Sequence, residues 1–168
     1  MSGSGKTTLA NYAEVFCSNL GLKTKIIDGD DIRRMDGKKL GFDYNDVSIN
    51  NLRIAKLCLD LKEEGFNIVI VPVISPYQQV RRQVKKLLEP YFSLIYIKAN
   101  IESLKLRDTK GLYSASDKGE IDNLIGYSLT NPYEEPLNQS LTIDTVENTI
   151  DESKKILSSF INNELLKC

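Results

Sequence analysis

The sequence predicts an α/β fold in which a parallel sheet is covered by helices on both faces. Short, continuous apolar runs rich in β-branched residues recur along the chain, and stretches of helical period separate them. Such runs are typical of strands buried on both faces, and their alternation with helices is typical of parallel sheets. With 168 residues and 41% hydrophobic content, the chain has the size of one domain with one core, so residues 1–168 are expected to form a single domain.

The strands and helices are expected to alternate along the whole chain. The strand runs are Lys25-Ile26-Ile27, Ile68-Val69-Ile70-Val71, Leu94-Ile95-Tyr96-Ile97 and, more weakly, Leu141-Thr142-Ile143. The apolar residues between them recur at helical spacing, which predicts helices over 6–19, 46–64, 78–88, 101–106 and 147–166. Each predicted strand is therefore followed by a helix, as the crossover connections of a parallel sheet require.

One segment, about 108–136, lacks any such periodicity. Gly111, Gly119, Gly126, Pro132 and Pro136 accumulate there among charged residues. Loops of this length in a compact domain are usually functional, so we expect a mobile lid in which the glycines are flex points.

Composition excludes several classes of function. Lys and Arg number 22 against 23 Asp and Glu, so no general excess of charge attracts nucleic acid or an acidic membrane. The longest apolar run, Ile68 to Ile74, contains Pro72 and is far shorter than the roughly 20 residues of a membrane span, and the first residues do not resemble a signal peptide. We therefore expect a soluble, cytoplasmic protein whose partner is a small molecule. Without histidine, and with widely spaced cysteines, a Cys/His zinc site is not expected.

The chain begins with a glycine-rich motif that is typical of phosphate binding. Ser2-Gly3-Ser4-Gly5-Lys6-Thr7-Thr8 is the end of a G-x-x-x-x-G-K-[ST] loop, and it opens a predicted helix. Backbone N–H groups of such a loop surround the phosphates of ATP, with Lys6 reaching the β- and γ-phosphates and Thr7 binding Mg²⁺. These residues are the candidate ATP site. The alternative is an ordinary Gly/Ser turn that caps a helix.

The first glycine of this motif, and the strand that normally delivers it, would precede Met1. Without that strand the sheet would expose two edges, which is unfavourable. The expectation is therefore a P-loop NTPase-type sheet whose first strand is missing from this sequence, because of either truncation or a misassigned start codon.

A pair of carboxylates follows the first predicted strand. Asp28-Gly29-Asp30 lies where parallel α/β sheets bind their ligands, at the carboxyl end of a strand. One carboxylate can hold Mg²⁺ and one can accept the proton of an attacking hydroxyl. Asp30 is the favoured base and, with Thr7, a predicted metal ligand, while Asp28 is the alternative base. The same tripeptide could also be a turn that caps a helix.

Further segments carry a family resemblance. They are Leu40-Gly41-Phe42, Asp46, Asn50, Arg53-Ile54, Ile74-Ser75-Pro76-Tyr77 with Arg81, Arg107-Asp108-Thr109-Lys110-Gly111-Leu112-Tyr113, Gly119-Glu120-Ile121 and Tyr133-Glu134-Glu135-Pro136. Their order and spacing resemble the adenylyl-sulfate kinase family from Met1 to about Thr145, and the stretch that begins at Arg107 is the most specific part.

The resemblance implies ATP- and Mg²⁺-dependent phosphorylation of adenylyl sulfate at its 3′-hydroxyl, in sulfate assimilation, by a protein that could form a homodimer. It also implies the acceptor contacts Arg33, Phe42, Asn50, Ile74, Ser75, Pro76, Tyr77 and Lys110, with Arg107 near the base of ATP. Each charged residue could instead be a solvated surface charge, Ser75 could cap the following helix, and Tyr77 could be a packing ring.

Two departures from the family lie on the acceptor side. Asp46-Val47 stands where the family usually has Asp-Arg, and Leu124-Ile125-Gly126-Tyr127-Ser128 where it commonly has Phe-Thr-Gly-Ile-Asp. Leu124 thus replaces an aromatic plate for the acceptor base. A first alternative function is therefore the same 3′-kinase chemistry on another acceptor, such as cytidine diphosphoramidate in surface-polysaccharide modification. A second is a nucleotide-binding module without catalysis.

Overall fold

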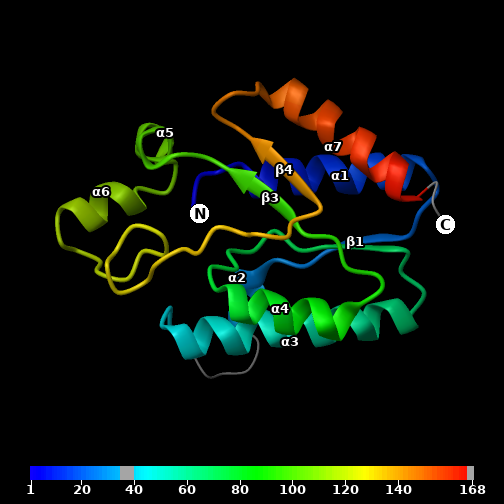
Figure 1. The fold of residues 1–168 in the computed structure, drawn as a ribbon, viewed down its shortest axis with the longest axis horizontal. Coiled ribbons are helices and arrows are strands. Elements are labelled where there is room, and N and C mark those ends of the chain that lie inside the picture. Colours follow the sequence, from blue (N-terminus) through cyan, green and yellow to red (C-terminus); the bar gives the residue numbers. More distant parts are fainter. Residues whose placement is uncertain (35–39, 166–168) are drawn as a thin grey trace.

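The computed structural model describes residues 1–34 and 40–165, and it has the predicted α/β architecture (Figure 1). The elements in chain order are α1 (Lys6–Asn19), β1 (Thr24–Ile26), α2 (Gly29–Arg34), α3 (Tyr44–Glu63), β2 (Ile68–Ile70), α4 (Gln78–Leu88), β3 (Ile95–Lys98), α5 (Ile101–Arg107), α6 (Leu112–Asp117), β4 (Leu141–Asp144) and α7 (Ile150–Leu165). Figure 1 shows the strands between a layer of α1 and α7 and a layer of α3 and α4.

The described strands form two separate parallel pairs. In one pair Thr24 lies opposite Ile68, and in the other Ile95 lies opposite Leu141. In the described residues no strand joins the two pairs, which agrees with the expectation that the first strand is absent from this sheet and leaves two edges exposed. Both pairs are parallel, as the continuous apolar runs predict.

Two apolar cores cover the strands, and Ile70 of β2 packs against the first of them. Leu9 and Ala13 of α1 pack with Ile143 of β4 and Leu157 of α7. On the other side, Ile54 and Leu61 of α3 pack with Ile27, which follows β1. These buried faces hold α1 and α3 against the strand ends, where the candidate residues lie.

Local side-chain caps set where several helices begin. α3 begins at Tyr44 rather than at the expected residue 46, because the Asp43 carboxylate accepts a hydrogen bond from the N–H of Asp46 at 2.8 Å. The Asn100 side chain caps α5 in the same way, through the N–H of Ser103 at 2.9 Å. Such caps satisfy N–H groups that have no partner within the helix.

The lid segment contains a helix, α6, that the sequence did not predict. The Asp108 carboxylate accepts hydrogen bonds from the N–H groups of Tyr113 and Ser114, at 3.2 and 3.0 Å, and so stabilises its first turn. The segment is therefore more regular than a structureless loop.

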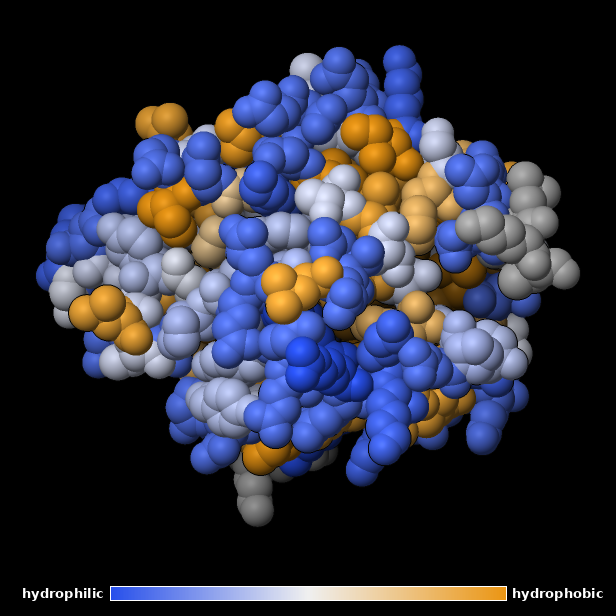
Figure 2. Space-filling view, viewed as in Figure 1, coloured by the Kyte–Doolittle hydropathy of each residue, from blue (hydrophilic) through white to orange (hydrophobic). Residues whose placement is uncertain are grey.

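The face of the molecule in Figure 2 shows apolar side chains scattered among hydrophilic ones. Among the described helices, none has both the length and the apolar character that crossing a bilayer needs.

Candidate functional site

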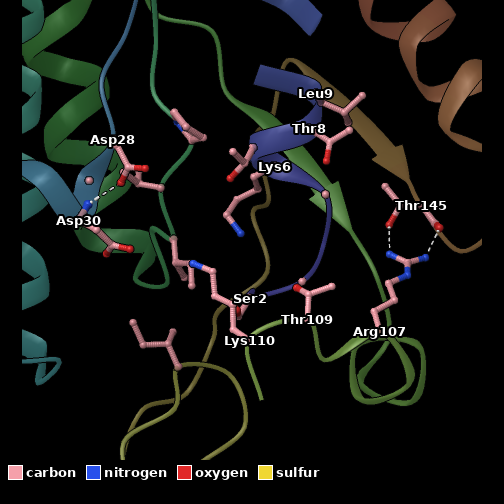
Figure 3. A pocket seen from close by; sticks show the side chains of 18 of the residues that line it. Ser2, Lys6, Thr8, Leu9, Asp28, Asp30, Arg107, Thr109, Lys110 and Thr145 are labelled. Carbon is pink, nitrogen blue, oxygen red and sulfur yellow. Dashed lines mark hydrogen bonds between the residues drawn. The ribbon is translucent and has the colours of Figure 1, made fainter. Parts of the chain in front are cut away.

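A large cavity of about 880 Å³ opens where the glycine-rich loop, the end of β1, the lid and the start of α7 converge (Figure 3). Most of the residues singled out from the sequence line it. They are Ser2, Gly3, Gly5, Lys6, Thr7, Thr8, Asp28, Asp30, Arg33, Phe42, Asn50, Ile74, Arg107 and Lys110. The fold thus gathers residues that are up to about a hundred positions apart in the sequence.

The glycine-rich loop has the backbone geometry of a phosphate cradle. Gly3 and Gly5 adopt φ angles of 73° and 95°, which side chains larger than hydrogen rarely permit, and Gly5 is the N-cap of α1. Turns of this kind direct successive N–H groups toward one point, next to the positive end of the helix dipole. Ser4 is buried beneath the loop and does not line the cavity.

Lys6 projects from this loop into the cavity, toward the side that carries Asp28 and Asp30 (Figure 3). Its Nζ donates a hydrogen bond to the carbonyl of Met1 at 2.5 Å. Burial, followed by the positive charge of Lys110, lowers the pKa of Lys6 to about 8, and the negative charge of Asp30 acts in the opposite direction. The negative charge of a bound polyphosphate would compensate the positive charge of the Lys6 ammonium group and raise its pKa.

The two carboxylates lie across the cavity from the loop. The N–H of Asp30 donates to Asp28 Oδ1 at 2.8 Å, which orients the Asp28 carboxylate at the start of α2. Gly29 between them lets the Val73 side chain pack close to the backbone, because a Cβ at position 29 would lie 2.4 Å from a methyl group of Val73. Both carboxylates are exposed and can therefore reach a ligand.

The cavity extends to both sides of the glycine-rich loop, so that labelled residues lie at two ends of it (Figure 3). At one end lie Arg107, Thr145 and the start of α7. The Arg107 guanidinium donates to the hydroxyl of Thr145 at 2.9 Å and to its carbonyl at 2.5 Å, which holds the plane of the guanidinium in place.

The other end combines cations, an aromatic ring and amides. Arg33 lies over the ring of Phe42 at 4.5 Å and donates to the carbonyl of Gly41. Burial lowers the pKa of Arg33, and Asp30 and Asp46 oppose that shift. Asn50 is buried and donates to the carbonyl of Gly29 at 3.2 Å. Lys110 reaches this end from the lid (Figure 3).

Four of the candidate acceptor contacts lie outside the cavity lining. The Ser75 hydroxyl accepts a hydrogen bond from Asn51 at 3.0 Å, and Pro76 and Tyr77 are buried. Leu124 packs against Ala99, Leu104 and Tyr113. The loop after β2 thus lines the cavity up to Ile74, and its next three residues pack behind the cavity wall.

The structure also adds lining residues that the sequence did not indicate. They are Leu9, Gly29, Asn51, Pro72, Val73, Thr109, Ile125, Thr145, Asn148, Thr149, Ile150 and Ser153. Gly29, Val73 and Thr109 adjoin predicted site residues, so chain proximity could have suggested them. Ile125 and the start of α7 carry no local signal, because only the tertiary arrangement brings them to the cavity.

The donors in the cavity suit a hard divalent cation that also binds phosphate. Thr7, Asp28 and Asp30 line the same cavity and offer oxygen ligands. In the part of the chain that the structure describes, no cluster of three or more carboxylate, cysteine or histidine side chains could enclose a metal ion by itself. The hydroxyl of Thr7 and the carboxylates of Asp28 and Asp30 are the kind of oxygen ligands that Mg²⁺ uses together with phosphate oxygens and water.

Comparisons with known proteins agree with this geometry. The family model described as adenylylsulphate kinase matches residues 1–144. An adenylyl-sulfate kinase of Prochlorococcus marinus is 40% identical over 169 residues, which cover 99% of this chain and 83% of that protein. An adenylyl-sulfate kinase of Bacillus pumilus is 37% identical over 165 residues, which cover 98% of this chain and 82% of that protein. The solved structure of the Mycobacterium tuberculosis APS kinase CysC in complex with AMPPNP and APS is similar with a TM-score of 0.84 and 28% identity, over 96% of this chain and 93% of that one.

Proposed function

The chain belongs to the adenylyl-sulfate kinase family, and we propose that it transfers the γ-phosphate of ATP to the 3′-hydroxyl of adenylyl sulfate. The products would be ADP and 3′-phosphoadenylyl sulfate. The observation that supports this proposal is a single cavity in which the glycine-rich loop lies between Arg107 and Thr145 on one side and Asp28 and Asp30 on the other (Figure 3). A structural relative that binds AMPPNP and APS together supports the same arrangement of donor and acceptor.

In this proposal the glycine-rich loop and Lys6 bind the triphosphate of ATP. The N–H groups that follow Gly3 and Gly5 donate to phosphate oxygens, and the Lys6 ammonium balances the charge that develops on the transferred group. Arg107, fixed on Thr145, lies at the end that would hold the adenine base. Stabilising charge on the β- and γ-phosphates in this way favours in-line transfer to the acceptor.

The acceptor nucleotide would occupy the end that contains Arg33 and Lys110. These two cations offset the charge of the phosphosulfate, and the Phe42 ring offers a flat face to the base. Asp30 would take the proton of the 3′-hydroxyl, with Asp28 as the alternative base. Because both carboxylates line the cavity opposite Lys6, either can reach a hydroxyl that points toward the γ-phosphate.

Mg²⁺ is a further part of the proposal. When bound, it neutralises the β- and γ-phosphates. Thr7 and one of the two carboxylates would hold it, namely Asp28 where Asp30 is the base, and Asp30 where Asp28 is the base.

The direct test offers ATP and Mg²⁺ with adenylyl sulfate or with cytidine diphosphoramidate and measures ADP release in a coupled assay. We expect turnover with adenylyl sulfate. Preference for the cytidine compound would instead identify an altered acceptor. Release of ADP with neither would favour a binding module without catalysis.

Substituting the proposed base sharpens this test. Asp30→Asn should lower kcat by about 10²- to 10⁴-fold and leave ATP binding measurable by calorimetry. The matched control is Asp31→Asn, because Asp31 lies on the same helix but pairs with Arg34 at 2.6 Å and does not line the cavity. Equal turnover by the two variants would contradict the assignment of Asp30.

A homodimer and a cytoplasmic location stay predictions of the sequence. Sedimentation velocity of the purified chain tests for the homodimer. A single species of 18.9 kDa would contradict it.

A further inference from the structure

One side chain, that of Thr145, joins the end of β4 to the glycine-rich loop. The Thr145 hydroxyl lies 3.3 Å from the carbonyl oxygen of Ser4 in the loop and 3.2 Å from that of Lys98 at the end of β3. A hydroxyl group carries a single proton, so it serves these two acceptors in turn or shares the proton between them. In both cases the hydroxyl ties the loop to the strand ends beside it.

The same hydroxyl also accepts a hydrogen bond from Arg107. One terminal nitrogen of the guanidinium donates to it at 2.9 Å, and the other donates to the Thr145 carbonyl at 2.5 Å (Figure 3). Hydrogen bonds in a chain polarise one another, so the charge of Arg107 makes the hydroxyl a better donor to the Ser4 carbonyl. One oxygen atom thus connects Arg107 at the end of α5 with the glycine-rich loop.

The remainder of Thr145 is held in place without the hydroxyl. Its N–H donates to the carbonyl of Lys98 at 2.9 Å, and the Lys98 ammonium pairs with Asp144 at 3.2 Å. Its methyl group lies beside the loop, where a Cβ on Gly5 would be 3.9 Å away. Removing the hydroxyl alone should therefore break the connection between Arg107 and the loop and leave the backbone of β4 where it is.

In the proposed function, on which this inference rests, the loop holds the triphosphate of ATP and Arg107 lies at the end for its base. Groups that are already fixed at the right separation lose less freedom when a ligand binds. We propose that Thr145 is a positioning residue, whose hydroxyl holds Arg107 in register with the glycine-rich loop. Base and triphosphate of one ATP molecule can then bind together.

The experiment compares binding of ATP with binding of inorganic tripolyphosphate, which can occupy the loop but has no base. Calorimetry in the presence of Mg²⁺ gives both Kd values. Thr145→Val keeps the shape of the side chain and removes the hydroxyl. It should raise the Kd of ATP about 10-fold, as expected for one hydrogen bond to a charged group, and change that of tripolyphosphate by less than about 2-fold.

Two further variants separate the hydroxyl from the rest of the side chain and from the strand. Thr145→Ser keeps the hydroxyl and should retain the binding of ATP. Thr142→Val removes a hydroxyl from the same strand, where Thr142 is exposed, bonds to Gln139 at 3.0 Å and does not line the cavity, and it should bind both ligands as the wild type does. In turnover assays Thr145→Val should raise the KM for ATP and leave the KM for adenylyl sulfate unchanged.

A double-mutant cycle with Arg107→Met tests whether Thr145 acts through Arg107. In that background Thr145→Val should change the Kd of ATP by less than about 2-fold, because the connected group is already gone. A full further loss there, an equal loss of tripolyphosphate binding, or a Thr145→Ser variant as weak as Thr145→Val would overturn the proposal.

These binding measurements need no turnover, so the two proposals can fail separately. A wild-type chain that binds ATP but releases no ADP with adenylyl sulfate would contradict the proposed function alone. A wild-type chain that does not bind ATP would overturn both.

Discussion

At the scale of single residues, Lys6 combines an unfavourable electrostatic environment with a central role in the proposed chemistry. It is partly buried, it lies near a second cation on the lid, and its Nζ donates hydrogen bonds to two neutral groups, the carbonyl of Met1 and the hydroxyl of Ser4. Both burial and like charge disfavour the ammonium form. The site therefore suits an anion, because the negative charge of a bound triphosphate would offset both effects.

Removing the lid cation should make Lys6 more basic. In Lys110→Met the repulsion is lost, so the pKa of Lys6 should rise above its value of about 8 in the ligand-free protein. The measurement is the rate of acylation of Lys6 as a function of pH, followed by mass spectrometry. Because only the neutral amine reacts, the midpoint should move to higher pH. The control is Lys118→Met on the same lid, and equal midpoints in both variants would contradict the prediction.

At the scale of secondary-structure elements, the end of the lid and the start of α4 are joined by one buried cation. Arg81, which is 5% exposed, donates to the carbonyls of Ser75 and Glu134 at 2.6 and 2.8 Å and to the side chain of Gln78 at 2.6 Å. The Glu134 carboxylate in turn accepts from the N–H of Gln78. These bonds fasten the lid to the loop that carries Ile74.

Losing this junction should destabilise the fold. Arg81→Met keeps most of the side-chain volume but removes the donor from two partly buried carbonyls, and leaving such a group unsatisfied costs about 1–3 kcal/mol. Urea denaturation should therefore show a lower free energy of unfolding, by about 2 kcal/mol or more. Arg82→Met is the control, because Arg82 is exposed on the same helix. A similar free energy of unfolding for the two variants would show that Arg81 does not hold the elements together.

The elements that the sequence predicted are those with a strong local signal. The run Ile68-Val69-Ile70-Val71 identifies β2, and the apolar spacing of α3 identifies a long helix. Helices α2 and α6 were missed because each has only six residues, too few for a helical period to show. The roles of Leu124 and Ile125 could not be separated either, since the lid is irregular and only tertiary packing decides which of two adjacent apolar residues faces the cavity.

At the scale of the whole molecule, the lid is fastened to the body on the side that carries the glycine-rich loop. Lys105 of α5 pairs with Asp117 of α6 at 2.6 Å and donates to the hydroxyl of Tyr127 at 3.1 Å, and that hydroxyl donates to Asp117. The Tyr127 ring packs edge-on against Tyr113, 5.3 Å between centroids, and the Tyr113 hydroxyl donates to the carbonyl of Ser2 at 3.1 Å. A continuous set of contacts thus runs from the lid surface to the phosphate cradle.

Loosening this attachment should let water compete with the acceptor for the γ-phosphate. Tyr127→Phe keeps the ring contact with Tyr113 but removes the hydroxyl that Lys105 and Asp117 share. Since a hydrogen bond contributes about 0.5–1.5 kcal/mol net, the lid should be open about 2- to 10-fold more often. An open lid admits water to the activated phosphoryl group. ADP release without acceptor, divided by release with adenylyl sulfate, should therefore rise by a similar factor.

Tyr12→Phe, which alters a ring stacked on Phe16 of α1, controls for the loss of a phenol hydroxyl elsewhere in the protein. An unchanged ratio in Tyr127→Phe would mean that the lid excludes water without this attachment.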